Sequence, residues 1–159
     1  MEDSLKILGI RNATKQFRYS LVLWDGQSAS LLNSSTENLI RMPVGIEEVS
    51  EQLYWLYQEL NRVIRQNSDI AYIALKPNEY GRGSESANSR TAAYFDGAVH
   101  LVAAQNKIPV ICKLYRQIGT KRDQVLQFAE DKVGKTQSNW NEQIADAVAV
   151  AWSVISEVN

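Results

Sequence analysis

Asp146 is the side chain of this sequence that most clearly needs a chemical explanation. Between Ile144 and Ile155 every residue except Asp146 and Ser153 is apolar, which predicts a helix that is buried over most of its surface. A carboxylate in such a helix requires a cation or a metal beside it, because an unpaired buried charge costs on the order of several kcal/mol. The alternative, which the sequence leaves open, is that Asp146 lies at an exposed edge of the helix and accepts hydrogen bonds from a loop.

Basic side chains stand at the ends of three apolar runs that are too short to be helices. In an open sheet, ligands bind beyond the carboxyl ends of parallel strands, so these cations predict a basic cleft that holds phosphate. If Arg11 and Lys76 face Asp146, these two cations take the place that a metal would occupy. In chain order they are Arg11, Lys76, Lys113 and Arg116.

The segment 76–84, which reads Lys-Pro-Asn-Glu-Tyr-Gly-Arg-Gly-Ser, is a second candidate site. It joins a predicted strand to a predicted helix, so its backbone N–H groups could form an anion-binding nest, with Arg82 and Arg90 adding charge. The dinucleotide fingerprint is incomplete here, since Ser86 stands where its third glycine would be. A solvated loop explains the segment equally well.

These residues require a scaffold, and hydrophobic periodicity predicts one. Alternating and continuous apolar runs indicate strands at 5–11, 16–24, 28–40, 70–75 and 108–114, with polar residues interrupting the third. Spacings of three and four residues indicate helices at 46–63, 89–106, 121–133 and 139–156, the last opened by a capping box that ends at Glu142. Helical links imply parallel strands, so we expect an α/β fold with a mixed five-stranded sheet, three antiparallel strands and then two parallel ones, flanked by helices.

The composition fits one globular domain over residues 1–159. The formal net charge is −1, so nucleic acid could bind only through a local basic patch. The only cysteine, Cys112, excludes an internal disulfide, and the only histidine, His100, excludes most histidine-rich metal sites. No apolar run approaches the roughly 20 residues that span a bilayer, and residues 1–6 do not resemble a signal peptide. We therefore expect a cytoplasmic protein without membrane contact.

Other notable residues have simple structural explanations. Cys112 lies in a predicted buried strand and is expected to be an inert core thiol, and His100 is expected to have a structural or surface role. Tyr54, Trp55 and Tyr57 lie on one helix but cannot all face the core. One of these aromatic side chains is therefore available for a protein partner or a homodimer.

The predicted order of elements resembles the RNase H-like superfamily, and four local strings resemble RuvC-type Holliday junction resolvases. Ile7-Leu8-Gly9-Ile10-Arg11 resembles the opening I-L-G-I-D of that family, and Ile73-Ala74-Leu75-Lys76 resembles its strand that ends in glutamate. The segment 92–110 resembles the following helix, turn and strand, and the run 145–151 resembles the closing helix with its A-D-A motif.

The resemblance implies two divalent metals, held by an Asp, a Glu and one or two further Asp residues, that cut phosphodiesters through activated water. In this sequence Arg11, Lys76 and Gln143 occupy three of those positions, and only Asp146 is retained. Magnesium needs oxygen donors and anionic charge, so we expect a degenerate site, no two-metal cleavage and no cofactor.

Three functions are compatible with these residues. The first is a pseudonuclease domain that binds nucleic acid, another phosphate ligand or a protein partner; its phosphate-binding candidates are Arg11, Lys76, Arg82, Arg90, Lys113 and Arg116. The second is an active Mg²⁺- or Mn²⁺-dependent nuclease with a rearranged site, in which Asp146 is joined by Glu142, Glu79, Asp25 or Asp96. The third is a structural or regulatory module that oligomerises through its aromatic helix.

Overall fold

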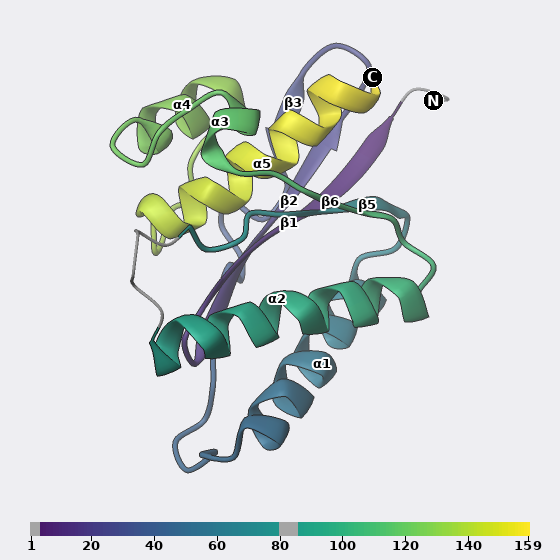
Figure 1. The fold of residues 1–159 in the computed structure, drawn as a ribbon. Helices are drawn as coiled ribbons and strands as arrows, with labels where there is room; N and C mark the ends of the chain where they lie inside the picture. Colours follow the sequence, from purple (N-terminus) through teal and green to yellow (C-terminus); the bar gives the residue numbers. More distant parts are fainter. Residues whose placement is uncertain (1–3, 80–85) are drawn as a thin grey trace.

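The computed structural model describes residues 4–79 and 86–159. One mixed sheet runs through the centre, in the order β3-β2-β1-β5-β6 (Figure 1). The strand β4 pairs with the other end of β2. The strands are β1 (Leu5–Ala13), β2 (Gln16–Trp24), β3 (Ala29–Leu31), β4 (Leu39–Arg41), β5 (Ile70–Leu75) and β6 (Val110–Cys112). The expected α/β class is confirmed, with antiparallel pairs on one side of β1 and parallel pairs on the other.

The sheet differs from the expectation on one side, because the predicted third strand is two short strands. The chain leaves β2 after β3 and returns to it at β4, and the buried side chain of Asn33 fills the gap between them. Its amide accepts a hydrogen bond from Leu21 N at 2.9 Å and donates to the carbonyls of Tyr19 and Glu37, both at 3.0 Å. A side-chain amide thus replaces ladder hydrogen bonds and allows the bend.

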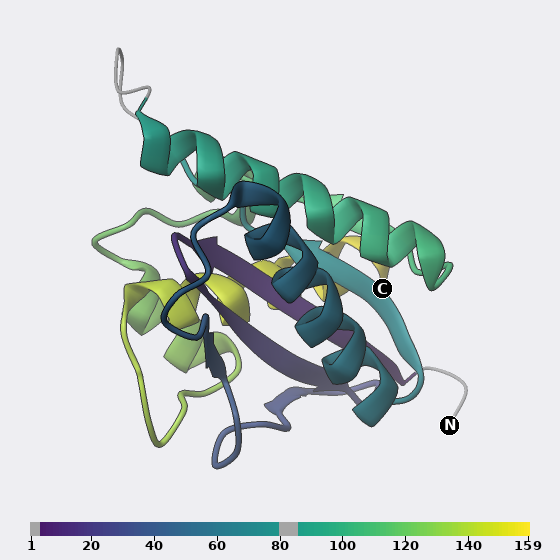
Figure 2. The ribbon, with the colours of Figure 1, turned by 90° about the horizontal axis from the view of Figure 1, so that it is seen from below.

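Helices cover both faces of the sheet. Figures 1 and 2 show α1 (Val49–Gln66) and α2 (Ala87–Gln105) on one face, and α5 (Glu142–Val158) on the opposite face with α3 (Tyr115–Ile118) and α4 (Val125–Lys132) beside it. Within the described ranges, no helix is both long and apolar enough to cross a membrane.

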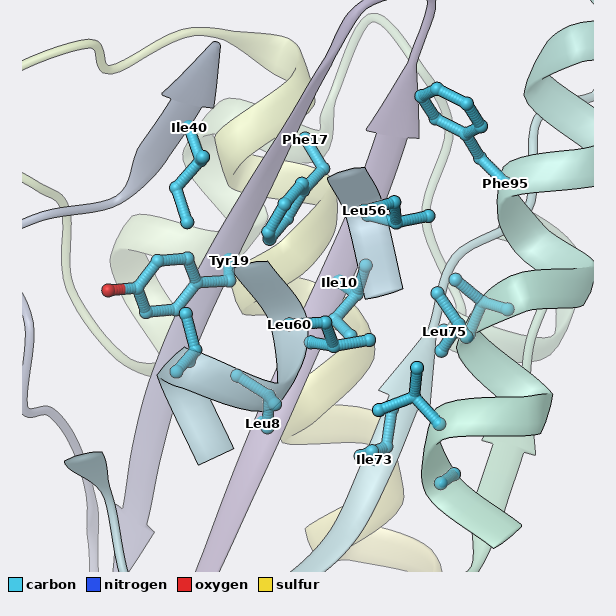
Figure 3. Packing of buried hydrophobic residues seen from close by; sticks show 14 of the residues in the cluster. Leu8, Ile10, Phe17, Tyr19, Ile40, Leu56, Leu60, Ile73, Leu75 and Phe95 are labelled. Carbon is cyan, nitrogen blue, oxygen red and sulfur yellow. The ribbon is translucent and has the colours of Figure 1, made fainter. Parts of the chain in front are cut away.

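The alternation of side chains along β1 divides the interior into two cores. Leu8 and Ile10 face α1 and α2, where they pack with large side chains such as Leu56 and Phe95 (Figure 3). Ile7 faces α5, whose buried surface consists mainly of alanine and valine. On this face a Cβ added to Gly9 would lie 2.0 Å from the carbonyl oxygen of Ala147, so only glycine permits the close approach of α5 to β1.

Arg11 has the same parity along β1 as Gly9, and its side chain therefore points towards α5 as well. The fold thus brings the end of β1 against the first two turns of the closing helix.

Three local predictions are wrong. The capping box that ends at Glu142 does not form, because α5 begins there and Asn141 is the N-cap, whose side chain accepts from Ile144 N at 3.1 Å. The predicted buried strand 108–114 is only the edge strand β6, and Cys112 is exposed rather than a core thiol. Its sulfur lies 3.4 Å from Nε2 of His100, which is itself on the surface of α2 as expected.

Candidate functional site

An ion pair between Arg11 and Asp146 lies at the centre of the candidate site. Arg11 Nε donates to Asp146 Oδ2 at 2.9 Å, although the two residues are 135 positions apart in the chain. Asp146 is 1% exposed and Arg11 is 8% exposed, so the pair is screened only weakly by solvent. Asp146 is therefore a buried carboxylate with a cationic partner, and the alternative of an exposed helix edge is wrong.

Tyr115, the first residue of α3, forms a hydrogen bond with the second carboxylate oxygen of Asp146. Its hydroxyl donates to Asp146 Oδ1 at 2.7 Å. Burial raises the pKa of the Tyr115 hydroxyl, and the neighbouring carboxylate raises it further, so the phenol keeps its proton and remains a donor. Both oxygens of Asp146 are thereby satisfied by protein groups.

Lys76 is the second buried cation of the site. It extends the pairing of β5 with β1, because its backbone N–H donates to the carbonyl of Ile10 at 3.0 Å. Its ammonium pairs with Glu79 Oε2 at 2.9 Å, donates to the carbonyl of Pro77 at 2.8 Å, and lies 4.0 Å from the centre of the Tyr115 ring. The side chain is 1% exposed, and its donors are directed at acceptors of its own loop.

Burial and pairing act in opposite directions on these charges. Burial raises the pKa of the Asp146 carboxyl, while Tyr115 and Arg11 act to lower it. Burial lowers the pKa of the Lys76 ammonium, while the hydrogen bond with Glu79 acts to raise it. Such opposing effects on the pKa values are typical of buried charges that are each stabilised by a partner in the folded state.

The loop after β5 adds further hydrogen bonds to this network. Arg11 Nη1 donates to Oδ1 of Asn78 and to the carbonyl of Asn12, and Asn78 Nδ2 donates to the same carbonyl at 3.2 Å. Glu79 also accepts a hydrogen bond from the backbone N–H of Tyr115 at 3.0 Å, which joins this loop to α3. We call Arg11, Lys76, Glu79, Tyr115 and Asp146 the ion cluster.

Solved Holliday junction resolvases share this architecture. RuvC from Thermus thermophilus matches with a TM-score of 0.76 and 17% identity, over 96% of this chain and 95% of the resolvase. The same resolvase in complex with a Holliday junction substrate matches with a TM-score of 0.77 and 16% identity over the same shares of the two chains. Fowlpox virus resolvase with its Holliday junction DNA matches with a TM-score of 0.53 and 14% identity, over 97% of this chain and 99% of the resolvase.

This chain has the RNase H-like fold of RuvC. The resemblance drawn from the four local strings is thereby confirmed at the level of the fold. Comparisons of sequence add nothing to it, since no family model and no curated protein match the chain.

The residues of this RuvC-like edge do not fit a pair of divalent metals. The guanidinium of Arg11 binds the one carboxylate retained, and the ammonium of Lys76 lies close enough to influence its pKa. In the part of the chain that the structure describes, no group of three or more metal-ligating side chains comes together. Two divalent cations would meet positive charge and two carboxylates, Asp146 and Glu79, that are each already paired with a cation.

The carboxylates of the rearranged nuclease hypothesis are dispersed in the fold. Asp25 accepts from the backbone N–H groups of Gln27 and Ser28, both at 2.8 Å, in the turn after β2. Asp96 accepts from Asn12 at 2.8 Å, and Asn12 points away from α5, so Asp96 lies on the opposite face of β1. The two that remain near Asp146 are Glu79, which pairs with Lys76, and the exposed Glu142.

The other predicted phosphate-binding residues are not gathered at one point. Lys113 is mostly buried and pairs with Glu157 near the end of α5 at 3.2 Å. Arg116 is exposed on α3, and Arg90 is exposed in the first turn of α2. Arg82 and most of the predicted anion-binding loop lie outside the described residues.

Two contributors to this edge are not evident from the sequence pattern. Tyr115 begins a four-residue helix, which is too short for any periodicity. Arg18 falls among the polar residues that alternate along β2, yet it is buried opposite Arg11 on the neighbouring strand. Its Nη1 donates to Gln143 Oε1. The sequence signal that could have found it is parity: in paired strands Arg11 and Arg18 must share the face that α5 covers.

Proposed function

We propose that this protein is a non-catalytic RNase H-like domain that binds nucleic acid. The ion pair between Arg11 and Asp146 carries the proposal. A guanidinium there supplies positive charge permanently, where the resemblance implies metal ions, and it supplies no site for an activated water.

Nuclease chemistry of the two-metal kind needs several carboxylates that converge on the metals. At this edge positions 11, 76 and 143 hold a guanidinium, an ammonium and an amide, of which the first two are buried. A metal that approached Asp146 would have to displace Arg11 and would be repelled by Lys76. We infer that the domain has exchanged metal binding for a stable internal network.

Support for nucleic-acid binding comes from the neighbours and from the surface charge. T. thermophilus RuvC and Fowlpox virus resolvase are both solved with Holliday junction DNA. Exposed basic residues surround the ion cluster at the same edge, on the β1–β2 turn, on β4, on α3 and in the turn before α4: Lys15, Arg41, Arg116, Lys121 and Arg122. Such a local patch can bind phosphate even though the formal net charge of the chain is −1.

The direct test measures binding and cleavage of four-way junctions and of single-stranded DNA and RNA, with Mg²⁺ or Mn²⁺ and again with chelator. We expect salt-dependent binding, no cleavage, and no effect of the chelator. The matched variant is Asp146→Asn, which is expected to alter stability but not the absence of cleavage. Metal-dependent cleavage that disappears in Asp146→Asn would overturn the proposal in favour of the rearranged nuclease.

A gain-of-function experiment tests the explanation from the opposite direction. The triple variant Arg11→Asp, Lys76→Glu, Gln143→Asp restores carboxylates at the three substituted positions. We expect Mn²⁺ to raise the melting temperature of this variant and to leave that of the natural protein unchanged. Adding Asp146→Asn to the triple variant should abolish the effect. Equal stabilisation of the natural protein by Mn²⁺ would show that Arg11 and Lys76 do not exclude the metal.

A second candidate function is self-association through α1 and α2. Tyr54, Tyr94 and Leu101 are 60%, 49% and 65% exposed, and they border a groove of about 560 Å³ between the two helices. The exposed stripe of α2 that continues from this groove carries no charge: Ala93, Tyr94, Gly97, Leu101 and Ala104.

We propose a second copy of the chain as the occupant of this surface. Antiparallel packing of two α2 helices about Gly97 would place each Leu101 near Ala93 of the other copy, since both lie four residues from the centre. It would also keep the two Arg90 side chains apart, whereas parallel packing would bring them together. Sedimentation velocity should show a dimer for the natural protein and a monomer for Leu101→Glu; two monomers would remove this candidate.

A further inference from the structure

Arg18 is a buried cation that the ion cluster does not use. It is 7% exposed, and among the described residues it has no carboxylate partner. Its Nη1 donates to the neutral amide of Gln143, and within the same described ranges its buried Nε has no hydrogen-bond partner. Buried arginine is normally retained with an anion beside it, because desolvating the guanidinium is costly.

The neighbours of Arg18 increase this imbalance. Arg11 lies directly opposite it on β1, and Gln16, two residues before it, pairs with Arg41. Burial lowers the pKa of the Arg18 guanidinium, and the positive charges of Arg11 and Arg41 lower it further. Asp146 compensates Arg11 but not Arg18, so the β1–β2 side of the edge has an excess of buried positive charge.

An open pocket of about 660 Å³ adjoins Arg18, and its walls are suited to an anion. Arg18 and Gln143 line it, together with Gln16, Leu126, Trp140, Asn141 and Glu142. The 17-residue helix α5 begins at this pocket with Asn141 as its N-cap. The first backbone N–H groups of a helix have no acceptor within it, and they place partial positive charge at the N-terminus.

We propose that this pocket, which we call the Arg18 pocket, binds a phosphate group. The guanidinium of Arg18 and the start of α5 supply the charge and the donors. The Nε of Arg18 is shielded from the pocket, and its lack of a partner among the described residues shows that the fold itself does not satisfy this cation. The indole of Trp140 adds an apolar wall, which suits a phosphate carried by a nucleotide or by a nucleic-acid strand. The site stands on its own contacts, whether or not the domain binds nucleic acid as proposed above.

Glu142 tests whether the ligand of the Arg18 pocket is an anion, because a carboxylate should weaken the binding of one. It is exposed, it lines the same pocket, and its carboxylate opposes a bound anion. Because it lies on the surface and forms no capping box, Glu142→Gln is expected to fold normally. This substitution should tighten phosphate binding, by roughly two- to fivefold for the removal of one partly screened charge.

The experiment titrates inorganic phosphate against the natural protein at constant ionic strength and follows the melting temperature and the heat of binding. We expect the melting temperature to rise with phosphate concentration. Arg18→Met should lose at least tenfold in affinity and Glu142→Gln should gain. Arg65→Met is the control, because it removes an exposed positive charge near the end of α1, and its affinity should match that of the natural protein.

The buried substitution carries a second readout that does not depend on the ligand. Without phosphate, Arg18→Met should melt at the same temperature as the natural protein or higher, since a desolvated and partly unsatisfied cation is replaced by an apolar chain of similar length. If Arg18→Met fails to fold, Glu142→Gln decides alone. An unchanged or weaker affinity in Glu142→Gln, an Arg18→Met variant that binds as tightly as the natural protein, or the absence of any phosphate effect would each overturn the proposal.

Two further arms identify the source of the phosphate. Adenosine monophosphate and a short single-stranded oligonucleotide are titrated under the same conditions. If Arg18→Met weakens oligonucleotide binding in parallel with phosphate binding, the Arg18 pocket holds a backbone phosphate. If only inorganic phosphate and the mononucleotide depend on Arg18, the pocket serves a small ligand. If the oligonucleotide does not bind at all, the proposed function fails while the pocket still stands.

Discussion

Removing the charge of Asp146 should destabilise the fold strongly, because Arg11 would be left buried without a counter-charge. Asp146→Asn keeps the shape of the side chain and an oxygen that can accept from Tyr115, so the change isolates the charge. Breaking one partner of a buried ion pair costs about 3 to 5 kcal/mol. The remaining hydrogen bonds place the expected loss near the lower end, about 3 kcal/mol, which lowers the melting temperature of a domain of this size by roughly 6 to 12 °C.

A double-mutant cycle separates the pair from its surroundings. Arg11→Met alone leaves Asp146 with Tyr115 and Lys76 nearby, and it should cost about 2 to 3 kcal/mol. The double variant removes both charges, so its cost should be well below the sum of the two single costs. We expect a coupling energy of about 2 to 3 kcal/mol, measured from urea unfolding followed by circular dichroism.

The control cycle uses the exposed pair Lys135 and Glu130, in which the charged atoms are 3.5 Å apart and the side chains are 58% and 40% exposed. Its coupling should be below about 1 kcal/mol, because solvent screens the interaction. Additive losses in the Arg11 and Asp146 cycle, equal to those of the control, would refute the view that a guanidinium holds this carboxylate in place of a metal.

Three other perturbations test the scaffold around the site by thermal and chemical unfolding. Gly9→Ala should cost about 3 kcal/mol or more, since its Cβ would lie 2.0 Å from the carbonyl oxygen of Ala147. Gly97→Ala is the control, because its Cβ would lie in open space within α2, and it should stabilise the protein by about 0.5 to 1 kcal/mol. Similar effects of the two substitutions would show that α5 does not pack closely on β1. Asn141→Ala should cost about 1 kcal/mol through loss of the N-cap, and a neutral result would argue against the observed start of α5. The pKa of the Tyr115 hydroxyl is raised in the folded state. Its contribution to the free energy of unfolding is therefore complete below the unfolded pKa of about 10 and is lost as the pH rises above that value. The stability of Tyr115→Phe should therefore fall less steeply as the pH rises above about 10 than that of the natural protein. An unchanged dependence of stability on pH would exclude the Tyr115 hydroxyl as the titrating group.

The fold was largely predictable because its elements have strong and separate periodicities. The run 70–75 is continuous and short, and the structure places β5 on those residues. The spacing along the first long helix was equally clear, although α1 begins at Val49 rather than at Ile46. The split of β3 from β4 was not predictable, because it depends on Asn33, whose hydrogen bonds connect residues brought together only by the folded sheet.

The site was predictable where one charge had to be compensated by another. An aspartate in an apolar helix requires a partner, and Arg11 and Lys76 at the predicted strand ends were candidates, while an exposed helix edge remained an alternative; the structure places Arg11 against Asp146. The burial of Lys76 did not follow, because strand ends usually reach solvent, and its burial depends on Glu79 and on the ring of Tyr115. Cys112 shows the converse error, since an apolar strand at the sheet edge leaves alternate side chains exposed.

The charges at this edge compensate Asp146 from within the chain. Carboxylates that converge on two metals repel one another when the metals are absent, whereas one carboxylate surrounded by Arg11 and Lys76 needs no ligand to be neutralised. Compensation is complete around Asp146 but stops at Arg18, whose guanidinium donates to an amide and, across residues 4–79 and 86–159, forms no ion pair, although the exposed Glu142 lines the same pocket. A cation buried for stability alone would be expected to have a carboxylate beside it, as Arg11 does. The difference between these two neighbouring arginines therefore assigns Arg11 to the architecture of the fold and leaves Arg18 for an anion that comes from outside the chain.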